Sequence, residues 1–313
     1  MRPLAVSPRS FRQVAGRHQE ILAASGLTPR YPSVDRHLTE AEMIELVAGC
    51  EALIVGIDPV TARVLDSGPV QVVAKYGSGL DNIDLRAAEQ RGVKVASTPG
   101  ANSQAVAELT LSLLFALARR IVPHHTSAMA GRWDRHIGVE LTGRRLGLIG
   151  LGQVGGRVAR MARAMGMEVV AHDPYVSTTD VPVVAMNELV SGADAVSLHV
   201  PLTEETRQLV DASFLAQMRP GSYLINTARF GLADIEAVAD ALASGHLAGA
   251  AFDDFGDRPD PGSRLWDLPG FLASPHAGAS TVEAVERTGV AALEIVLEAL
   301  VIAPSVETRK EEL

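Results

Sequence analysis

The chain has 313 residues, of which 47% are hydrophobic and 21% are charged, a composition typical of a folded globular protein and not of a disordered one. This length is sufficient for two domains with cores of their own. The net charge of −9 argues against nucleic acid as a main partner and gives no overall attraction for an anionic substrate. An anionic substrate would therefore have to be bound by local groups.

The ends and the cysteine content bear on where the protein works. The N-terminal sequence MRPLAVSPRS has too short an apolar stretch for a signal peptide. The longest apolar helix candidate, around 109–118, is interrupted by Ser112 and is too short to span a bilayer. The single cysteine, Cys50, excludes an intrachain disulfide and fits a reducing compartment. We therefore expect a cytoplasmic protein with no membrane partner.

Strand and helix patterns alternate at short intervals along the first hundred residues. Apolar runs predict strands at 4–6, 52–55, 70–75 and 93–96. A doubly wound α/β unit is expected from this alternation. Helices are predicted from about Phe11, from a capping box at Thr39–Glu42 toward Val47, at 62–65 and at 85–90.

The most informative segment is 146–173, LGLIGLGQVGGRVARMARAMGMEVVAHD. An apolar run is followed by Gly150, Gly152 and Gly155, which give G-x-G-x-x-G at a strand-to-helix turn. The first glycine permits the tight turn, the second lets the backbone approach a pyrophosphate, and the third lets the helix pack closely on the sheet. A second apolar run ends at Asp173, 23 residues after Gly150, near the offset expected for a ribose-binding acid. The segment therefore predicts a dinucleotide site.

Asp173 also indicates which dinucleotide is bound. Its carboxylate can accept hydrogen bonds from a ribose 2′-hydroxyl, but it would repel a 2′-phosphate. Pro174 and Tyr175 follow, so no arginine stands beside it to neutralise that phosphate. NAD is therefore favoured over NADP.

The alternation continues to the C-terminus. Strands are predicted at 195–198, 223–226, 248–252 and 271–273, and Asp234 is expected to cap a helix that Gly245 closes. The simplest architecture has two doubly wound parallel-sheet domains, with a Rossmann NAD-binding domain (99–282) inserted into a flavodoxin-like substrate domain (1–98 and 283–313). A C-terminal helix at about 282–300 would return to the first domain.

Six motifs in chain order resemble those of the D-isomer-specific 2-hydroxyacid dehydrogenase family, including its phosphoglycerate and glyoxylate/hydroxypyruvate dehydrogenases. Besides the fingerprint, they are YGSGLDNID at 76–84, TPGAN at 98–102 leading to VAE at 106–108, HVPLT at 199–203 with Thr206, NTAR at 226–229, and LWDLP at 265–269 leading to SPH at 274–276. The resemblance covers the chain from its first strand to its last helix. It implies an NAD-dependent oxidoreductase that interconverts a small 2-keto acid and its D-2-hydroxy acid.

The resemblance also assigns roles that the chemistry of a keto acid explains. Arg229 would bind the carboxylate and polarise the carbonyl, because guanidinium offers a fork of donors. His276 would donate the proton that completes the hydroxyl. N–H groups of the Ser78–Gly79 turn would bind the far side of the carboxylate. The residues implied for the cofactor are Gly150, Gly152, Gln153, Val154, Gly155, Asp173, Val200, Pro201, Thr206, Thr227 and Asp253; no metal site is expected.

One position departs from the family pattern. The family pairs its catalytic histidine with a glutamate placed before a proline, and here that position is Arg258. A carboxylate would raise the histidine pKa and orient the ring, whereas a cation would lower that pKa. Asp257 or Asp254 is a possible substitute, and the sequence leaves the choice open.

The sequence leaves two alternative functions open and predicts a homodimer. Arg258 keeps open an NAD(H)-binding sensor or corepressor-like protein with weak catalysis, and the same fold also admits a formate or phosphite dehydrogenase. The helix at 105–120 is apolar around most of its circumference, so one domain is unlikely to cover it. Together with the family resemblance, this predicts a homodimer through that helix.

Overall fold

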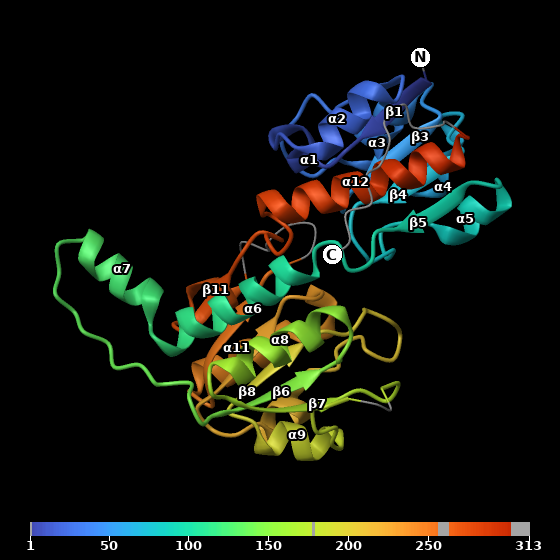
Figure 1. Ribbon diagram of the computed structural model, residues 1–313. Helices are drawn as coiled ribbons and strands as arrows, with labels where there is room; N and C mark the ends of the chain where they lie inside the picture. The colour runs from blue at the N-terminus through green and yellow to red at the C-terminus, as the bar shows by residue number, and fades with distance from the viewer. Residues whose placement is uncertain (1, 177–178, 256–262, 302–313) are drawn as a thin grey trace. The chain divides into compact units, whose positions relative to one another are not determined.

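The computed structural model of the chain describes residues 2–176, 179–255 and 263–301 (Figure 1). It divides into unit 1, Met1–Asn102 with Ser280–Leu313, and unit 2, Ser103–Ala279. Each unit is built on one parallel sheet, which confirms the expected fold class.

Unit 1 has a five-stranded parallel sheet in the order β2-β1-β3-β4-β5, the flavodoxin-like order. Alternate side chains of β1 enter different cores: Leu4 and Val6 pack with α12, and Ala5 packs with α3. Both faces of the sheet are therefore covered. The strands are β1 (Arg2–Val6), β2 (Leu27–Arg30), β3 (Ala52–Val55), β4 (Val72–Lys75) and β5 (Lys94–Ser97); the helices are α1 (Arg9–Gln13), α2 (Arg17–Ala24), α3 (Glu40–Val47), α4 (Ala62–Asp66), α5 (Leu85–Gln90) and α12 (Val282–Ala299).

Unit 2 has a six-stranded parallel sheet in the order β11-β10-β9-β8-β6-β7. The strands are β6 (Arg145–Ile149), β7 (Glu168–His172), β8 (Ala195–Leu198), β9 (Ser222–Asn226), β10 (Leu247–Phe252) and β11 (Phe271–Ala273). One core packs α6 (Ser103–Ala118) and α8 (Gln153–Ala164) on the sheet, and the other packs α9 (Met186–Gly192), α10 (Ala212–Gln217) and α11 (Ile235–Ala243). Short 3₁₀ helices lie at η1 (Phe230–Leu232) and η2 (Arg264–Asp267), and α7 (Ile121–Met129) follows α6.

A reduced strand completes the Rossmann pattern of unit 2. Ala171 in β7 forms a parallel bridge with Val183, in which Ala171 donates to Pro182 and Val184 donates to Ala171, both at 2.9 Å. With this bridge counted as the third strand, the order is 3-2-1-4-5-6, extended by β11. The order reverses between β6 and β8, where ligands bind in such sheets.

The expected caps are confirmed. Thr39 accepts from the backbone of Glu42 while the Glu42 side chain bonds back to Thr39, so the capping box is complete. The Asp234 side chain accepts from the N–H groups of Glu236 and Ala237 at the start of α11. Both helices begin where their sequences predicted.

The apolar helix expected at 105–120 is α6, and the expectation that its apolar face lies open was largely wrong. Leu111, Leu113, Leu114 and Leu117 are buried in the core of unit 2, where the sheet and α8 cover them. A helix packed between a sheet and another helix needs apolar residues on more than one face. Phe115 remains 37% exposed.

None of the helices in the described part of the chain is both long and apolar enough to cross a membrane.

Candidate active site

The glycine-rich turn has the geometry that its sequence predicted. Gly150 has φ of +95°, and a Cβ there would lie 2.5 Å from the carbonyl oxygen of His199. A Cβ on Gly155 would lie 2.1 Å from the carbonyl oxygen of Gly150. A Cβ on Gly152 would meet no atom of the chain within 4 Å. The first and third glycines are therefore required by the fold, and the second faces open space, as approach of a pyrophosphate would require.

Asp173 lies beside this turn, at the end of β7. Its Oδ2 accepts the N–H of Leu151 at 2.8 Å, and its Oδ1 accepts the N–H of Tyr175 at 2.9 Å. Two backbone donors thus fix the carboxylate next to the turn from which α8 begins. Gln153 and Val154, also expected to contact the cofactor, lie in the first turn of α8. The arrangement fits a ribose bound next to a pyrophosphate.

The second expected cofactor loop follows β8. Thr206 Oγ1 donates to the carbonyl of Pro201 at 2.7 Å and accepts the N–H of Thr203 at 2.8 Å, which fixes the loop at Val200–Thr206. His199 at the start of the loop bonds Ser197 Oγ at 3.0 Å, and burial lowers its pKa to about 4. His199 is therefore neutral near pH 7 and holds the loop.

A buried asparagine fixes the turn that carries Arg229. The Asn226 side chain, 1% exposed, accepts from the N–H of Ala228 at 3.1 Å and donates to the carbonyl of Arg229 at 2.8 Å. Thr227 Oγ1 lies 2.8 Å from Thr110 Oγ1 of α6. Arg229 is partly exposed at the carboxyl end of β9. The sequence did not indicate the contact with Thr110, because 117 residues separate the two threonines.

His276 lies in a segment that Asp253 organises. The Asp253 carboxylate accepts the Ser274 hydroxyl at 2.5 Å and the N–H groups of Ala277 and Gly278 at 2.8 and 2.7 Å. His276 has φ of +52°, a left-handed conformation that a non-glycine residue adopts only where its surroundings enforce it. Burial raises the pKa of Asp253, while these bonds act in the opposite direction. The carboxylate of Asp253 thus holds the backbone around His276, and its expected contact with the cofactor stays a prediction.

The structure describes one of the two aspartates that could serve as the carboxylate partner of His276. Asp254 Oδ1 lies 3.9 Å from His276 Nδ1, within ion-pair distance but longer than a hydrogen bond. The Asp254 side chain is 17% exposed. Asp257 and Arg258 lie outside the described residues.

Strand order brings these side chains to one edge of the sheet in unit 2. Arg229 follows β9, Asp253 and Asp254 follow β10, and His276 follows β11, and these three strands are neighbours. The strands run parallel, so their carboxyl ends share the edge at which Asp173 and the glycine turn also lie. The predicted catalytic and cofactor residues of unit 2 thus follow the same ends of one sheet.

The expected substrate loop belongs to unit 1. It leaves β4 at Gly77, with φ of +131°, and the Thr98 hydroxyl accepts the N–H of Gly77 at 2.9 Å. In the part of the chain that the structure describes, the N–H groups of Ser78, Gly79 and Leu80 have no acceptor. Successive free N–H groups of this kind can bind an anion.

The chain matches a family model for the NAD binding domain of D-isomer specific 2-hydroxyacid dehydrogenases over residues 111–278. This range lies within unit 2 and contains the glycine turn, Asp173, Arg229 and His276.

Full-length relatives support the match. The chain is 39% identical over 273 residues to a hydroxypyruvate reductase of Thermotoga maritima, covering 84% of this chain and 89% of that protein. It is 36% identical over 277 residues to a D-3-phosphoglycerate dehydrogenase of Synechocystis, covering 86% of this chain but only 50% of that protein. A crystallised protein of Thermus thermophilus superposes with a TM-score of 0.87 at 37% identity, over 97% of this chain and 99% of that one. A dinucleotide-binding geometry and these matches lead to one assignment: the chain belongs to the D-isomer-specific 2-hydroxyacid dehydrogenase family, whose cofactor is NAD.

Proposed function

We propose that the chain reduces a small 2-keto acid to its D-2-hydroxy acid, or catalyses the reverse, and that hydroxypyruvate and glyoxylate are the first substrates to assay. The observation that carries the proposal is His276, held in a left-handed conformation by Asp253 at the sheet edge where Arg229 also lies. The relative of Thermotoga maritima, which this chain matches over most of its length, is a hydroxypyruvate reductase. The phosphoglycerate dehydrogenase is about twice as long as the matched region, so phosphoglycerate is a second choice.

The roles follow from the chemistry of the side chains. The Arg229 guanidinium binds the substrate carboxylate and polarises the adjacent carbonyl. The free N–H groups at Ser78 and Gly79 bind the far side of that carboxylate. NADH, when bound, supplies the hydride. His276 donates its proton to the carbonyl oxygen and so completes the hydroxyl.

Asp254 is our choice for the carboxylate that assists His276. At 3.9 Å from Nδ1 its carboxylate lies within ion-pair distance of the ring, where a negative charge assists proton donation. With this partner in place, Arg258 at the family's glutamate position does not abolish proton donation.

A steady-state assay tests the function. NADH oxidation would be followed with glyoxylate, hydroxypyruvate, pyruvate and 3-phosphohydroxypyruvate, with formate and phosphite plus NAD as controls for hydride donation by another anion. Turnover with at least one keto acid, and a higher kcat/KM with NADH than with NADPH, are expected. Tight NADH binding without turnover of any of these compounds would instead favour the sensor or corepressor-like alternative.

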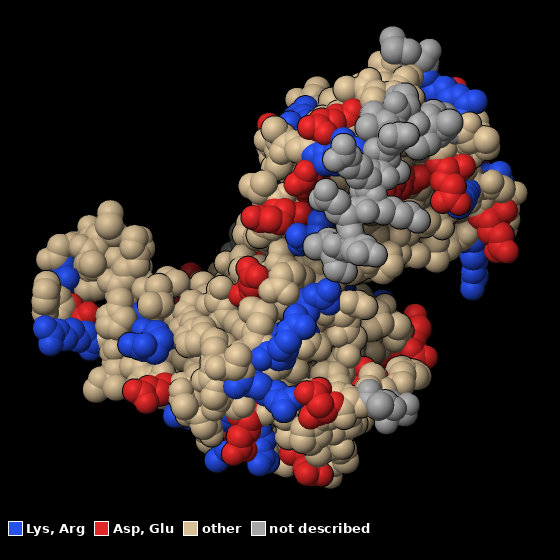
Figure 2. All heavy atoms as spheres, in the orientation of Figure 1, with Lys and Arg blue, Asp and Glu red and all other residues tan. Residues whose placement is uncertain are grey.

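We also propose a homodimer, supported by exposed apolar side chains next to α6. After α6 the chain forms α7 and then an extended segment, and the two project from the sheet of unit 2 (Figure 1). We call α7 and this segment the arm. Met129, Trp133 and Ile137 in this arm are 75%, 83% and 95% exposed, and Figure 2 shows the arm as mostly tan with a few blue and red spheres from its charged residues. Such a patch favours burial against a second copy.

Light scattering at micromolar concentration tests the assembly. A mass of two chains is expected, and Trp133→Glu should lower it toward one chain. A wild-type mass of one chain would overturn the proposal.

A cytoplasmic location is likewise proposed, because the single cysteine, Cys50, is a buried free thiol, as is common in a reducing compartment. Cell fractionation checks it.

A further inference from the structure

A polar cluster is buried beneath the 76–82 loop of unit 1, and the proposed chemistry uses none of its side chains. Its members are Ser7, Gly56, Asp58, Lys75 and Asn82, and we call it the loop-base cluster. Lys75 is 3% exposed and Asp58 is 6% exposed. A buried ammonium group is costly unless its hydrogen bonds are made.

Lys75 links three points of the backbone. It is the last residue of β4, directly before the loop, and its Nζ donates to the carbonyl of Gly56 after β3 and to Asn82 Oδ1, both at 2.5 Å. The Asn82 amide donates to the carbonyl oxygens of Gly56 at 3.1 Å and Asp58 at 2.5 Å. Lys75 and Asn82 therefore tie the far end of the loop to its near end and to the end of β3.

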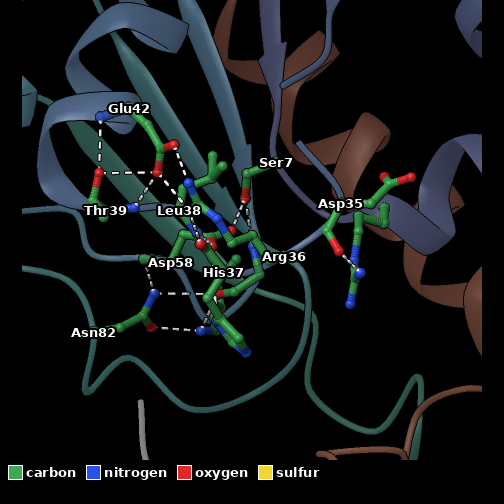
Figure 3. Close-up of polar contacts among 12 residues, drawn as sticks. Ser7, Asp35, Arg36, His37, Leu38, Thr39, Glu42, Asp58 and Asn82 are labelled. Atoms are coloured by element: carbon green, nitrogen blue, oxygen red, sulfur yellow. Dashed lines mark hydrogen bonds and ion pairs between the residues drawn. The ribbon is translucent and has the colours of Figure 1, made fainter. Parts of the chain in front are cut away.

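Asp58 is itself held from two other elements. Its Oδ2 accepts the Ser7 hydroxyl at 2.5 Å, and its Oδ1 accepts the N–H of Leu38 at 2.8 Å, with His37 Nδ1 3.9 Å away. Figure 3 shows Ser7, Leu38 and Asn82 reaching Asp58 from different segments. The carbonyl that Asn82 bonds thus belongs to a residue that is already fixed.

The near end of the loop has a separate anchor. Thr98 accepts the N–H of Gly77 on its hydroxyl, and the N–H of Thr98 donates to the carbonyl of Gly77, both at 2.9 Å. Between the two anchors lie residues 78–81, which include the three N–H groups without an acceptor among the described residues. The anchors therefore determine where those N–H groups point.

We propose that Lys75 is a positioning residue: acting through Asn82, it holds the N–H groups of Ser78, Gly79 and Leu80 in the geometry that binds the substrate carboxylate. This rests on the proposed function, because that function places the carboxylate at this loop. An apolar residue would fill a buried strand end without the cost of burying a charge. The ammonium at this position is explained by the loop geometry that its bonds maintain.

Lys75→Met tests the proposal, because it keeps the length of the side chain and removes the donor. We expect KM for the keto acid to rise ~10- to 100-fold with a smaller change in kcat, since displacement of a binding group by about 1 Å has effects of this size. The dissociation constant for NADH, which binds unit 2, should not change. Lys94→Met is the matched control, because Lys94 lies on the neighbouring strand with its side chain half exposed.

A second variant and a second measurement keep the test decisive. Asn82→Ala removes the other half of the link at a partly exposed position, and it serves alone if Lys75→Met does not fold. Its effect on KM should be similar, and the double variant should show much less than the sum of both effects in free energy. Unchanged KM in both variants, or an equal rise in Lys94→Met, would overturn the proposal.

Amide hydrogen exchange tests the anchoring of the loop without relying on the proposed function. Exchange at residues 78–83 should be faster in Lys75→Met than in the wild-type chain. If the wild-type chain reduces no keto acid, the proposed function falls, and the exchange measurement decides the anchoring by itself. Faster exchange then supports the anchoring, and unchanged exchange overturns it.

Discussion

Asp253 accepts the backbone N–H of His276 on its carbonyl oxygen at 2.7 Å, while its carboxylate accepts the N–H groups of the next two residues, Ala277 and Gly278. One residue thus determines the course of the chain on both sides of His276. Space is also tight there, since a Cβ on Gly278 would lie 2.9 Å from Asp253 Oδ2.

Replacing this carboxylate should impair proton donation. Asp253→Asn places an amide N–H₂ where an oxygen now accepts a backbone N–H, so we expect the His276 segment to shift and kcat to fall by about 10²-fold. The dissociation constant for NADH, measured by fluorescence titration, should stay near the wild-type value. Ser274→Ala removes only one of the three bonds and should have a smaller effect. A large loss of NADH affinity with normal kcat would instead assign Asp253 to the cofactor.

Asp254→Asn tests the partner of His276. Loss of the carboxylate 3.9 Å from the ring removes a negative charge that would assist proton donation, so turnover in the reduction direction should fall by roughly 10²-fold at pH 7. Steady-state kcat for the keto acid, measured for the variant and the wild-type chain, checks this. Arg258→Glu in the otherwise wild-type chain should change little. If Arg258→Glu raises the rate while Asp254→Asn has no effect, Asp254 is not the partner.

Two glycines of the fingerprint provide a matched pair. Gly152→Val adds a side chain in open space at a φ of −75°, so the variant should fold with a normal melting temperature and bind NADH about 10²-fold more weakly. Gly155→Ala places a Cβ 2.1 Å from a carbonyl oxygen and should lower the melting temperature. Calorimetry and NADH titration of both variants check the difference. Equal loss of stability in the two would contradict it.

His199 makes stability depend on pH. Because its pKa in the folded chain is about 4 and its ordinary value is 6.5, the unfolded chain binds the extra proton between these pH values. Stability from this residue is therefore present above about pH 6.5 and is lost as the pH falls toward 4. Urea unfolding of the wild-type chain and of His199→Gln at pH 7.5 and pH 5 measures it. The variant should lose less stability between the two conditions, and an identical loss would contradict the assignment.

The strands that the sequence predicted well are those buried on both faces. Segments such as 52–55 and 195–198 are continuous apolar runs, and they became β3 and β8 with the same limits. β2 was not predicted, because it is an edge strand with the sequence Leu-Thr-Pro-Arg and has no apolar run. The bridge at Val183 also escaped prediction, because Pro182 interrupts the short apolar run at 181–184. Edge pairing is determined by the neighbouring strand more than by the local sequence.

The candidate site, like the strands, was predicted only in part from the sequence. Local motifs predicted where the glycine turn, Asp173, Arg229 and His276 stand in the chain, since each follows a recognisable strand. They did not show that Asp253 holds the His276 segment or that Lys75 bonds Asn82. These contacts depend on how separate segments meet in the folded chain, which no local pattern encodes.

The two backbone bonds of Asp173 link cofactor choice to the integrity of a loop. The carboxylate that repels a 2′-phosphate also accepts the N–H groups of Leu151 and Tyr175. Removing it to admit NADP would therefore leave two donors of the binding surface without their acceptor. A change of nucleotide preference from this starting point would therefore need a new acceptor for these N–H groups as well. A single substitution of Asp173 should weaken the binding surface and not only change which nucleotide it accepts.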